Sequence, residues 1–277
     1  MTRDDPRVVV VLGLGEIGRP IHDILAERYR VIGRDLDPVE VDDPTDVLHV
    51  CFPFSRDRFV HQCAEYVEEY RPALVVVHST VVPGTTREIQ RLAGVPTAYS
   101  PVRGKHARMR SELLSYTKFV AGVSSGDCAR AEAHLMAAGF TTAAFDRPED
   151  LELAKLLETT YFGILVGWAQ EAQRYCDALG ADFAQVMTFG DEVPFFPPVV
   201  YQPGHIGGHC VIPNTYLLDE VRRSPLVDWL RASNDERAEG LSAEGVSTAV
   251  RVEPKPRGNL SRADASVLGG DTANRVT

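Results

Sequence analysis

The chain has 277 residues, is 44% hydrophobic and 25% charged, and carries a formal net charge of −10 at pH 7. This length suits about two domains, and the composition is that of a soluble globular protein. The acidic balance argues against a nucleic-acid partner, because no basic stripe compensates for it. The five cysteines are scattered, odd in number and without metal-ligand spacing, which indicates reduced thiols rather than a disulfide framework. We expect a cytoplasmic protein without a signal peptide or membrane segment, because no apolar run approaches the ~18 residues of a membrane span.

The first motif is Gly13-Leu14-Gly15-Glu16-Ile17-Gly18, a G-x-G-x-x-G sequence that directly follows four consecutive valines. The valines predict a buried strand, and the residues after the motif have helical spacing. Strand, glycine motif and helix in this order are typical of a dinucleotide-binding loop. Gly13 would make the tight turn, Gly15 would admit the pyrophosphate, and Gly18 would let the helix pack on the strand, with the helix N-terminus facing the phosphates. Glu16 and Ile17 complete the predicted cofactor loop.

Arg34 and Asp35 follow the second predicted strand, with the acid 17 positions beyond Gly18. An acid here accepts hydrogen bonds from the adenosine ribose and repels a 2′-phosphate, which favours NAD. Arg34 leaves NADP open, because an arginine at this place can accommodate the extra phosphate.

Further predicted strands at 47–52, 74–78, 118–123 and 141–145 alternate with helices, which predicts a Rossmann-type doubly wound parallel sheet over residues 1–146. Ligands in such sheets bind beyond the carboxyl ends of the strands. Residues just past these ends are therefore site candidates: Phe52 and Pro53 beside the cofactor, Ser79 and Thr80 for nicotinamide or substrate, and Arg103, Lys105 and His106 for an anionic substrate group. A solvated basic loop is an equal alternative for the last three.

A second, mainly helical domain is expected over residues 147–239, built on one long helix from about 146 to 178. Its length and apolar character favour packing against a second subunit, so we expect a homodimer. Lys155 lies on an otherwise covered flank and needs a partner or a role. Residues 240–277 have little periodicity and are expected to form a flexible tail.

The stretch 203–214, Pro-Gly-His-Ile-Gly-Gly-His-Cys-Val-Ile-Pro-Asn, predicts a rigid loop that presents one thiol, Cys210, next to the imidazole of His209. His209 is also a candidate for contacting the substrate. A thiol reacts as its thiolate, which a nearby cation or a helix N-terminus stabilises. A zinc site is not expected, since further ligands at tetrahedral spacing are missing from the sequence.

Several motifs together resemble the UDP-glucose/GDP-mannose 6-dehydrogenase family, over about residues 7 to 238. They are residues 13–18, Ser-Thr-Val-Val-Pro-Gly-Thr-Thr at 79–86, Ser-Pro at 100–101, Glu-Leu-Ala-Lys-Leu-Leu-Glu-Thr-Thr-Tyr at 152–161, and Gly-Gly-His-Cys at 207–210. The resemblance implies oxidation of a primary alcohol to a carboxylate in two NAD-dependent steps. It assigns Cys210 as the thiol that traps the aldehyde, Lys155 as the lysine that steadies the oxyanion, and Thr80 as a neighbour of nicotinamide and substrate.

Three positions depart from the family pattern. Val102 replaces a Glu, Thr159 replaces an Asn, and Asn214 replaces an Asp that could handle the proton. Hydrolysis of the thioester, the step that most needs a base, is the step this affects. The family's C-terminal domain, which helps hold the nucleotide, has no counterpart here, so we expect a smaller anionic substrate or a completing partner.

Three functions therefore stay open. The first is covalent oxidation of an alcohol or aldehyde through Cys210. The second is a two-electron dehydrogenase or reductase with Lys155 as acid or base. The third is a regulatory protein that binds NAD without turnover.

Overall fold

The computed structural model describes residues 7–190, 199–244 and 252–254, and the chain forms two compact units. Unit 1 comprises Met1–Phe162 and Gly208–Asp228, and unit 2 comprises Gly163–Gly207 and Trp229–Thr277. The predicted boundary at 146/147 is not where these units divide, since helix α6 (Pro148–Leu179) contributes to both. The predicted tail is wrong at its start, because α9 (Pro225–Glu244) includes residues 240–244. The rest of that tail, except β9 (Val252–Pro254), lies outside the described residues.

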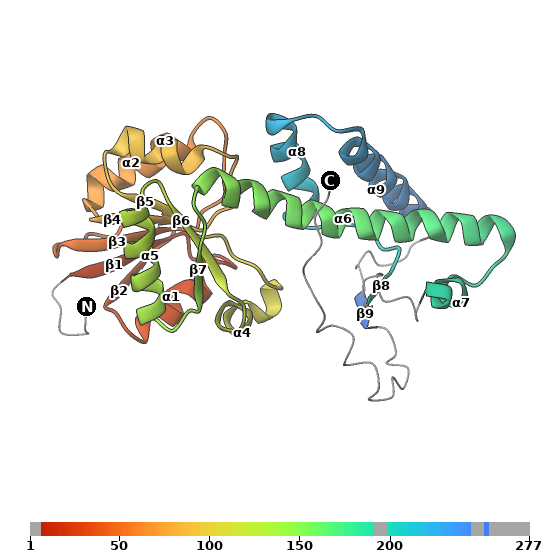
Figure 1. The fold of residues 1–277 in the computed structure, drawn as a ribbon, viewed down its shortest axis with the longest axis horizontal. Coiled ribbons are helices and arrows are strands. Elements are labelled where there is room, and N and C mark those ends of the chain that lie inside the picture. Colours follow the sequence, from red (N-terminus) through yellow and green to blue (C-terminus); the bar gives the residue numbers. More distant parts are fainter. Residues whose placement is uncertain (1–6, 191–198, 245–251, 255–277) are drawn as a thin grey trace, which may run out of the picture. The chain divides into compact units, whose positions relative to one another are not determined.

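Unit 1 is built on a seven-stranded sheet with the order β2-β1-β3-β4-β5-β6-β7 (Figure 1). The strands are β1 (Val8–Leu12), β2 (Val31–Arg34), β3 (Thr45–Val50), β4 (Leu74–Val77), β5 (Thr97–Tyr99), β6 (Lys118–Gly122) and β7 (Thr142–Ala144). All neighbouring pairs are parallel except β5 and β6, which are antiparallel. The predicted Rossmann-type doubly wound sheet is confirmed, and the antiparallel pair was not predicted.

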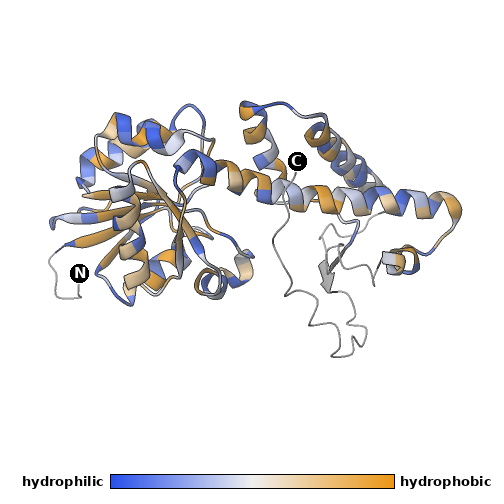
Figure 2. Ribbon diagram, in the orientation of Figure 1, coloured by the Kyte–Doolittle hydropathy of each residue, from blue (hydrophilic) through white to orange (hydrophobic). Residues whose placement is uncertain are grey.

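The strand pleat sends alternate valines into two separate cores. The strands of the sheet are coloured mainly as hydrophobic in Figure 2. Val9 and Val11 pack with residues of α1 (Gly18–Ala26), α4 (Met109–Ser115) and α5 (Ser125–Ala137). Val8 and Val10 pack on the opposite face with residues of α2 (Phe59–Tyr70) and α3 (Thr85–Ala93). All four valines are completely buried, which is why this run reads as continuous rather than alternating hydrophobicity.

Unit 2 is held together by polar contacts between α6, α9 and the chain before the cysteine. The Gln170 side chain donates to the Gly204 carbonyl (2.8 Å) and accepts from the Ser233 hydroxyl (2.8 Å). Asn234 accepts from the Ile206 backbone N–H at 2.7 Å. The unit also contains α7 (Phe183–Met187) and the antiparallel pair β8 (Val199–Tyr201) and β9. Among the described residues, no helix combines the length and apolar character that a membrane crossing requires.

Candidate active site

The glycine loop between β1 and α1 has the local geometry that its sequence predicts. Gly13 has φ of +84°, and a Cβ there would lie 2.9 Å from the Phe52 nitrogen. A Cβ at Gly18 would lie only 1.7 Å from the Gly13 carbonyl oxygen, whereas a Cβ at Gly15 would meet nothing within 4 Å. Gly13 and Gly18 are therefore required by the protein's own packing, and Gly15 leaves the backbone open to an approaching ligand. Ile17 occupies the N-cap position of α1 and packs against the core.

The two residues that end β2 have different environments. The Asp35 side chain is exposed and accepts a hydrogen bond from the Leu14 backbone N–H at 3.3 Å, beside the glycine loop. The Arg34 guanidinium donates to Glu69 (2.5 Å) and to the Tyr70 hydroxyl (2.6 Å), and its side chain is only 11% exposed. Arg34 is therefore engaged with α2, while Asp35 stays beside the loop.

Other candidates lie where β3 and β4 end. The Ser79 hydroxyl donates to the Phe52 carbonyl at 2.6 Å and thereby ties the two strand ends together. The Phe52 ring packs against Phe59 of α2 at 5.0 Å between centroids. Pro53 is exposed and Thr80 is partly buried. Ser79 and Phe52 thus shape the sheet edge through their own mutual contacts.

Cys210 is the N-cap residue of α8 (Val211–Val221), a helix that returns to unit 1. The predicted loop through Asn214 is wrong in its second half, since the helix begins at Val211. Pro213 is compatible with this start, because the backbone N–H groups of the first turn have no intrahelical acceptor to lose. The thiol therefore lies at the positive end of a helix, a position that stabilises a thiolate.

Lys155, Thr159 and Asn214 converge with Cys210 within unit 1. The Asn214 amide, which is buried, donates to the Thr159 hydroxyl at 3.0 Å and so joins α8 to α6. Lys155 lies one turn before Thr159, forms an ion pair with Glu158 at 3.1 Å, and has a side chain that is 12% exposed. Two of the three positions at which the resemblance implies a change from the family residue, 159 and 214, thus bond to each other.

The surroundings of Cys210 act on the pKa of its thiol in opposite directions. Burial raises the pKa of the Cys210 thiol, the Lys155 ammonium lowers it, and the Glu16 carboxylate raises it. Glu16 belongs to the glycine loop, and it also forms an ion pair with His209 (Oε2 to Nε2, 3.1 Å). The sequence did not predict that the loop and the cysteine segment meet through these side chains.

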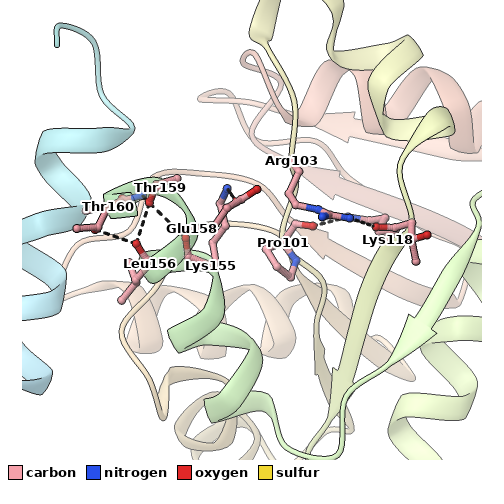
Figure 3. A network of polar contacts seen from close by, with 10 residues as sticks. Pro101, Arg103, Lys118, Lys155, Leu156, Glu158, Thr159 and Thr160 are labelled. Atoms are coloured by element: carbon pink, nitrogen blue, oxygen red, sulfur yellow. Dashed lines mark hydrogen bonds and ion pairs between the residues drawn. The ribbon is translucent and has the colours of Figure 1, made fainter. Parts of the chain in front are cut away.

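One residue of the predicted anion cluster, Arg103, has internal partners. The Arg103 guanidinium donates to the Thr117 carbonyl at 2.6 Å and stacks on the Phe119 ring. Lys105 is exposed, and His106 begins a 3-10 turn, residues 106–108. Figure 3 shows Arg103 beside Pro101 and Lys118, with Lys155 and Thr159 on α6. Arg103 is thus part of the wall of the site rather than a freely extended side chain.

Lys118 is a buried cation that sequence reasoning missed. Its ammonium donates to the carbonyls of Ser100 (2.9 Å) and Pro101 (3.2 Å). Burial, together with the charges of Arg103 and Lys155, lowers its pKa to about 7. Because β6 runs antiparallel to β5, its first residue lies at the edge where the parallel strands end. The sequence gives no sign that β6 is antiparallel, so it did not predict that Lys118 lies at this edge of the sheet.

Three buried histidines form a chain that ends at the same carbonyl. The Ser100 oxygen can only accept, so His78 Nδ1 donates to it at 2.6 Å. Burial lowers the pKa of His78, His49 and His134, which keeps the rings neutral. His78 Nε2 therefore accepts from His49 Nδ1 (2.9 Å), and His49 Nε2 accepts from His134 (3.0 Å). The chain fixes all three tautomers and helps hold Ser100.

Glu152 was also missed, although it lies in a quoted motif. It is completely buried on α6 and accepts from the Gly84 N–H (2.6 Å), the Thr86 N–H (2.8 Å) and the Thr86 hydroxyl (2.6 Å). These donors belong to the start of α3, whose helix dipole favours a carboxylate. Glu152 therefore fixes the part of α6 that carries Lys155 to the sheet domain.

Comparison with known proteins gives a consistent result. Residues 149–235 match the central domain of the UDP-glucose/GDP-mannose dehydrogenase family. The UDP-N-acetyl-D-mannosamine dehydrogenase of Methanococcus vannielii is 22% identical over 281 aligned positions, which cover 82% of this chain. The enzyme of the same name from Pyrococcus horikoshii is 26% identical over 227 positions, covering 77% of this chain.

These matches make the chain similar to proteins of the UDP-glucose/GDP-mannose dehydrogenase family. The solved structure of the Pyrococcus horikoshii UDP-D-ManNAc dehydrogenase superposes with a TM-score of 0.74 at 21% identity, over 86% of this chain and 71% of that one. The chain spans 65% of the Methanococcus vannielii relative and 51% of the Pyrococcus horikoshii relative in the sequence matches. The family match contains Lys155, Thr159, Cys210 and Asn214, the residues that meet in unit 1.

Proposed function

We propose that this chain is an NAD-dependent oxidoreductase that oxidises a primary alcohol or its aldehyde through Cys210. The observation that carries the proposal is the meeting, within one compact unit, of a thiol at a helix N-terminus, a lysine that acts electrostatically on it, and the glycine loop. A family of dehydrogenases is consistent with that arrangement.

The glycine loop fits a dinucleotide pyrophosphate, because Gly15 has open space above it and the N-terminus of α1 follows. Asp35 is available to the adenosine ribose, while Arg34 is engaged by Glu69. This supports NAD rather than NADP. Bound NAD would supply the oxidant, and the remaining chemistry belongs to the chain's own side chains.

In this proposal the sulfur of Cys210 bonds to the aldehyde carbon and holds it as a thiohemiacetal. The Lys155 ammonium stabilises the negative oxygen that forms, as preorganised cations do at developing oxyanions. Thr159 and Asn214 hold α8 against α6 through their hydrogen bond. This bond fixes the Cys210 sulfur, at the N-terminus of α8, relative to the Lys155 ammonium on α6. A later thioester would then be released by water as a carboxylate.

The relatives named above are UDP-N-acetyl-D-mannosamine dehydrogenases, and this supports a proposal for the substrate class. We propose an anionic nucleotide sugar, or a smaller anion that carries the same primary alcohol. The test is calorimetric titration with NAD, followed by product analysis over a panel of UDP-sugars and small hydroxy acids. Failure to bind NAD and to turn over any of them would refute the proposal.

A two-electron oxidation with Lys155 as acid or base is the second candidate. It is favoured by the raised pKa of the Cys210 thiol and by Asn214, whose amide cannot act as a base. The yield of NADH per substrate separates the two, since covalent oxidation to the carboxylate yields two and this alternative yields one.

We also propose a homodimer through α6. Its outward side chains are large and apolar, and they are exposed by 52% to 84%: Leu157, Tyr161, Trp168, Tyr175 and Leu179. Such a stripe is typical of an interface. Light scattering should give twice the 30.5 kDa chain mass, and Trp168→Glu should give a monomer.

A further inference from the structure

The contact between the Glu16 carboxylate and the His209 imidazole joins the glycine loop to the residue next to the reactive thiol. His209 Nε2 lies 3.1 Å from the Glu16 carboxylate, and the same carboxylate acts on the Cys210 thiol. One carboxylate therefore contacts the imidazole and acts electrostatically on the sulfur. In such an arrangement the thiol is the nucleophile, the imidazole is its base, and the carboxylate orients the base.

Cys210 needs such a base. Burial raises the pKa of its thiol, so the sulfur is protonated near neutral pH and must lose that proton before it attacks. The two positions where the resemblance implies a carboxylate do not provide one. Val102 is buried in the apolar core, and the Asn214 amide is bonded to Thr159. Neither side chain can accept a proton at neutral pH.

Lys155 has a different task, because its ammonium is paired with Glu158 and steadies charge as a cation. Glu158 lies on α6 and is engaged by that ammonium. Glu16 and Lys155 are the charged groups that act on the thiol, and His209 is the neighbour that can both accept and return a proton.

We propose that His209, oriented by Glu16, is the general base of the Cys210 chemistry and supplies what the missing carboxylates would have done. This rests on the proposed function, in which Cys210 is the nucleophile. His209 is the catalytic residue of the pair, and Glu16 is a positioning residue that holds the ring and stabilises the imidazolium.

The proton movements are balanced without any further reagent. As Cys210 sulfur bonds to a carbonyl carbon, its proton passes to His209 and the carbonyl electron pair moves to oxygen. The imidazolium then releases this proton to water, so His209 is neutral again before hydrolysis. In thioester hydrolysis, water bonds to the carbonyl carbon while His209 takes one of its protons. The carbon–sulfur bond then breaks, the electron pair stays on sulfur, and the imidazolium returns the proton to it.

The test isolates these steps from NAD and from the natural substrate. p-Nitrophenyl acetate acetylates a nucleophilic thiol and releases one equivalent of p-nitrophenolate as a burst, and hydrolysis of the acetyl-Cys210 thioester then sets the steady rate. Peptide mass spectrometry confirms which cysteine carries the acetyl group. We expect His209→Gln to slow the release of the acetyl group by about 10²- to 10⁴-fold, the range of general base catalysis. Glu16→Gln should slow it less, and added imidazole should restore a His209→Gly variant.

Folding is not at risk in these variants, because the His209 and Glu16 side chains are 69% and 56% exposed. A matched control is His22→Gln, which removes another histidine–carboxylate pair in unit 1, the partly exposed His22 with Asp23 at 3.0 Å. The His22→Gln variant should hydrolyse the acetyl-Cys210 thioester at the wild-type rate. Deacetylation of His209→Gln within twofold of the wild type would overturn the role of His209 while leaving Cys210 intact. A burst that survives in Cys210→Ala would overturn the nucleophile itself, and this proposal with it.

Discussion

The buried histidine chain predicts a steep loss of stability in mild acid. The pKa values of His49, His78 and His134 are depressed in the folded protein, that of His134 to about 3. Unfolded histidine titrates near 6.5. The neutral chain therefore contributes its full stability above that value, and the contribution is lost as the pH falls, because only the unfolded state then takes up protons.

The size of the effect follows from this linkage. One pH unit below 6.5, each histidine costs about 1.4 kcal/mol of unfolding free energy, or about 4 kcal/mol for three. Lys118, whose pKa is lowered to about 7, adds a smaller loss in the same direction between pH 7.5 and 7. Glu152 acts in the opposite direction at lower pH, because burial raises the pKa of its carboxyl.

Urea unfolding followed by circular dichroism at pH 7.5, 6.5 and 5.5 measures this slope. His134→Gln should reduce the slope by about one third, whatever it does to stability at pH 7.5. His61→Gln, which changes an exposed histidine on α2, should leave the slope unchanged. A wild-type loss below about 1 kcal/mol between pH 6.5 and 5.5, or an unaltered slope in His134→Gln, would refute the neutral chain.

Four more variants test the architecture. Gly15→Ala should keep the wild-type melting temperature but bind NAD more weakly by calorimetry, whereas Gly18→Ala should lower the melting temperature, because its Cβ would lie 1.7 Å from a carbonyl oxygen. Glu69→Ala should raise affinity for NADP by freeing Arg34, and an unchanged NAD-to-NADP ratio would contradict the assignment of that arginine. Glu152→Gln should cost about 2 kcal/mol in urea unfolding, because one amide oxygen cannot replace a carboxylate that accepts three hydrogen bonds.

Local features of the chain were predictable because their causes are local. The valines of β1 and the glycine loop are adjacent in sequence, so pattern and steric requirement predict both strand and turn. The α6 helix was predicted from about 146 to 178 and extends over Pro148–Leu179. In contrast, α5 was not predicted, although its capping box, Ser124 with Asp127, is a sequence signal that could have been used.

Long-range features were not predictable from one sequence. His49, His78 and His134 are isolated histidines in the sequence, and only the strand order and the docking of α5 bring their rings together. The Glu16–His209 pair likewise depends on α8 returning to unit 1. The cysteine segment misled prediction because its glycines and prolines signal a loop, while the helix begins immediately after the thiol.

The central claim is that Cys210 carries the substrate covalently beside Lys155. Acid quenching of the enzyme during turnover of NAD with a UDP-sugar substrate, followed by peptide mass spectrometry, tests it most directly. The account predicts an acyl adduct on the peptide that contains Cys210, which accumulates further in His209→Gln. An enzyme that turns over at full rate while that peptide stays unmodified in both proteins would contradict it.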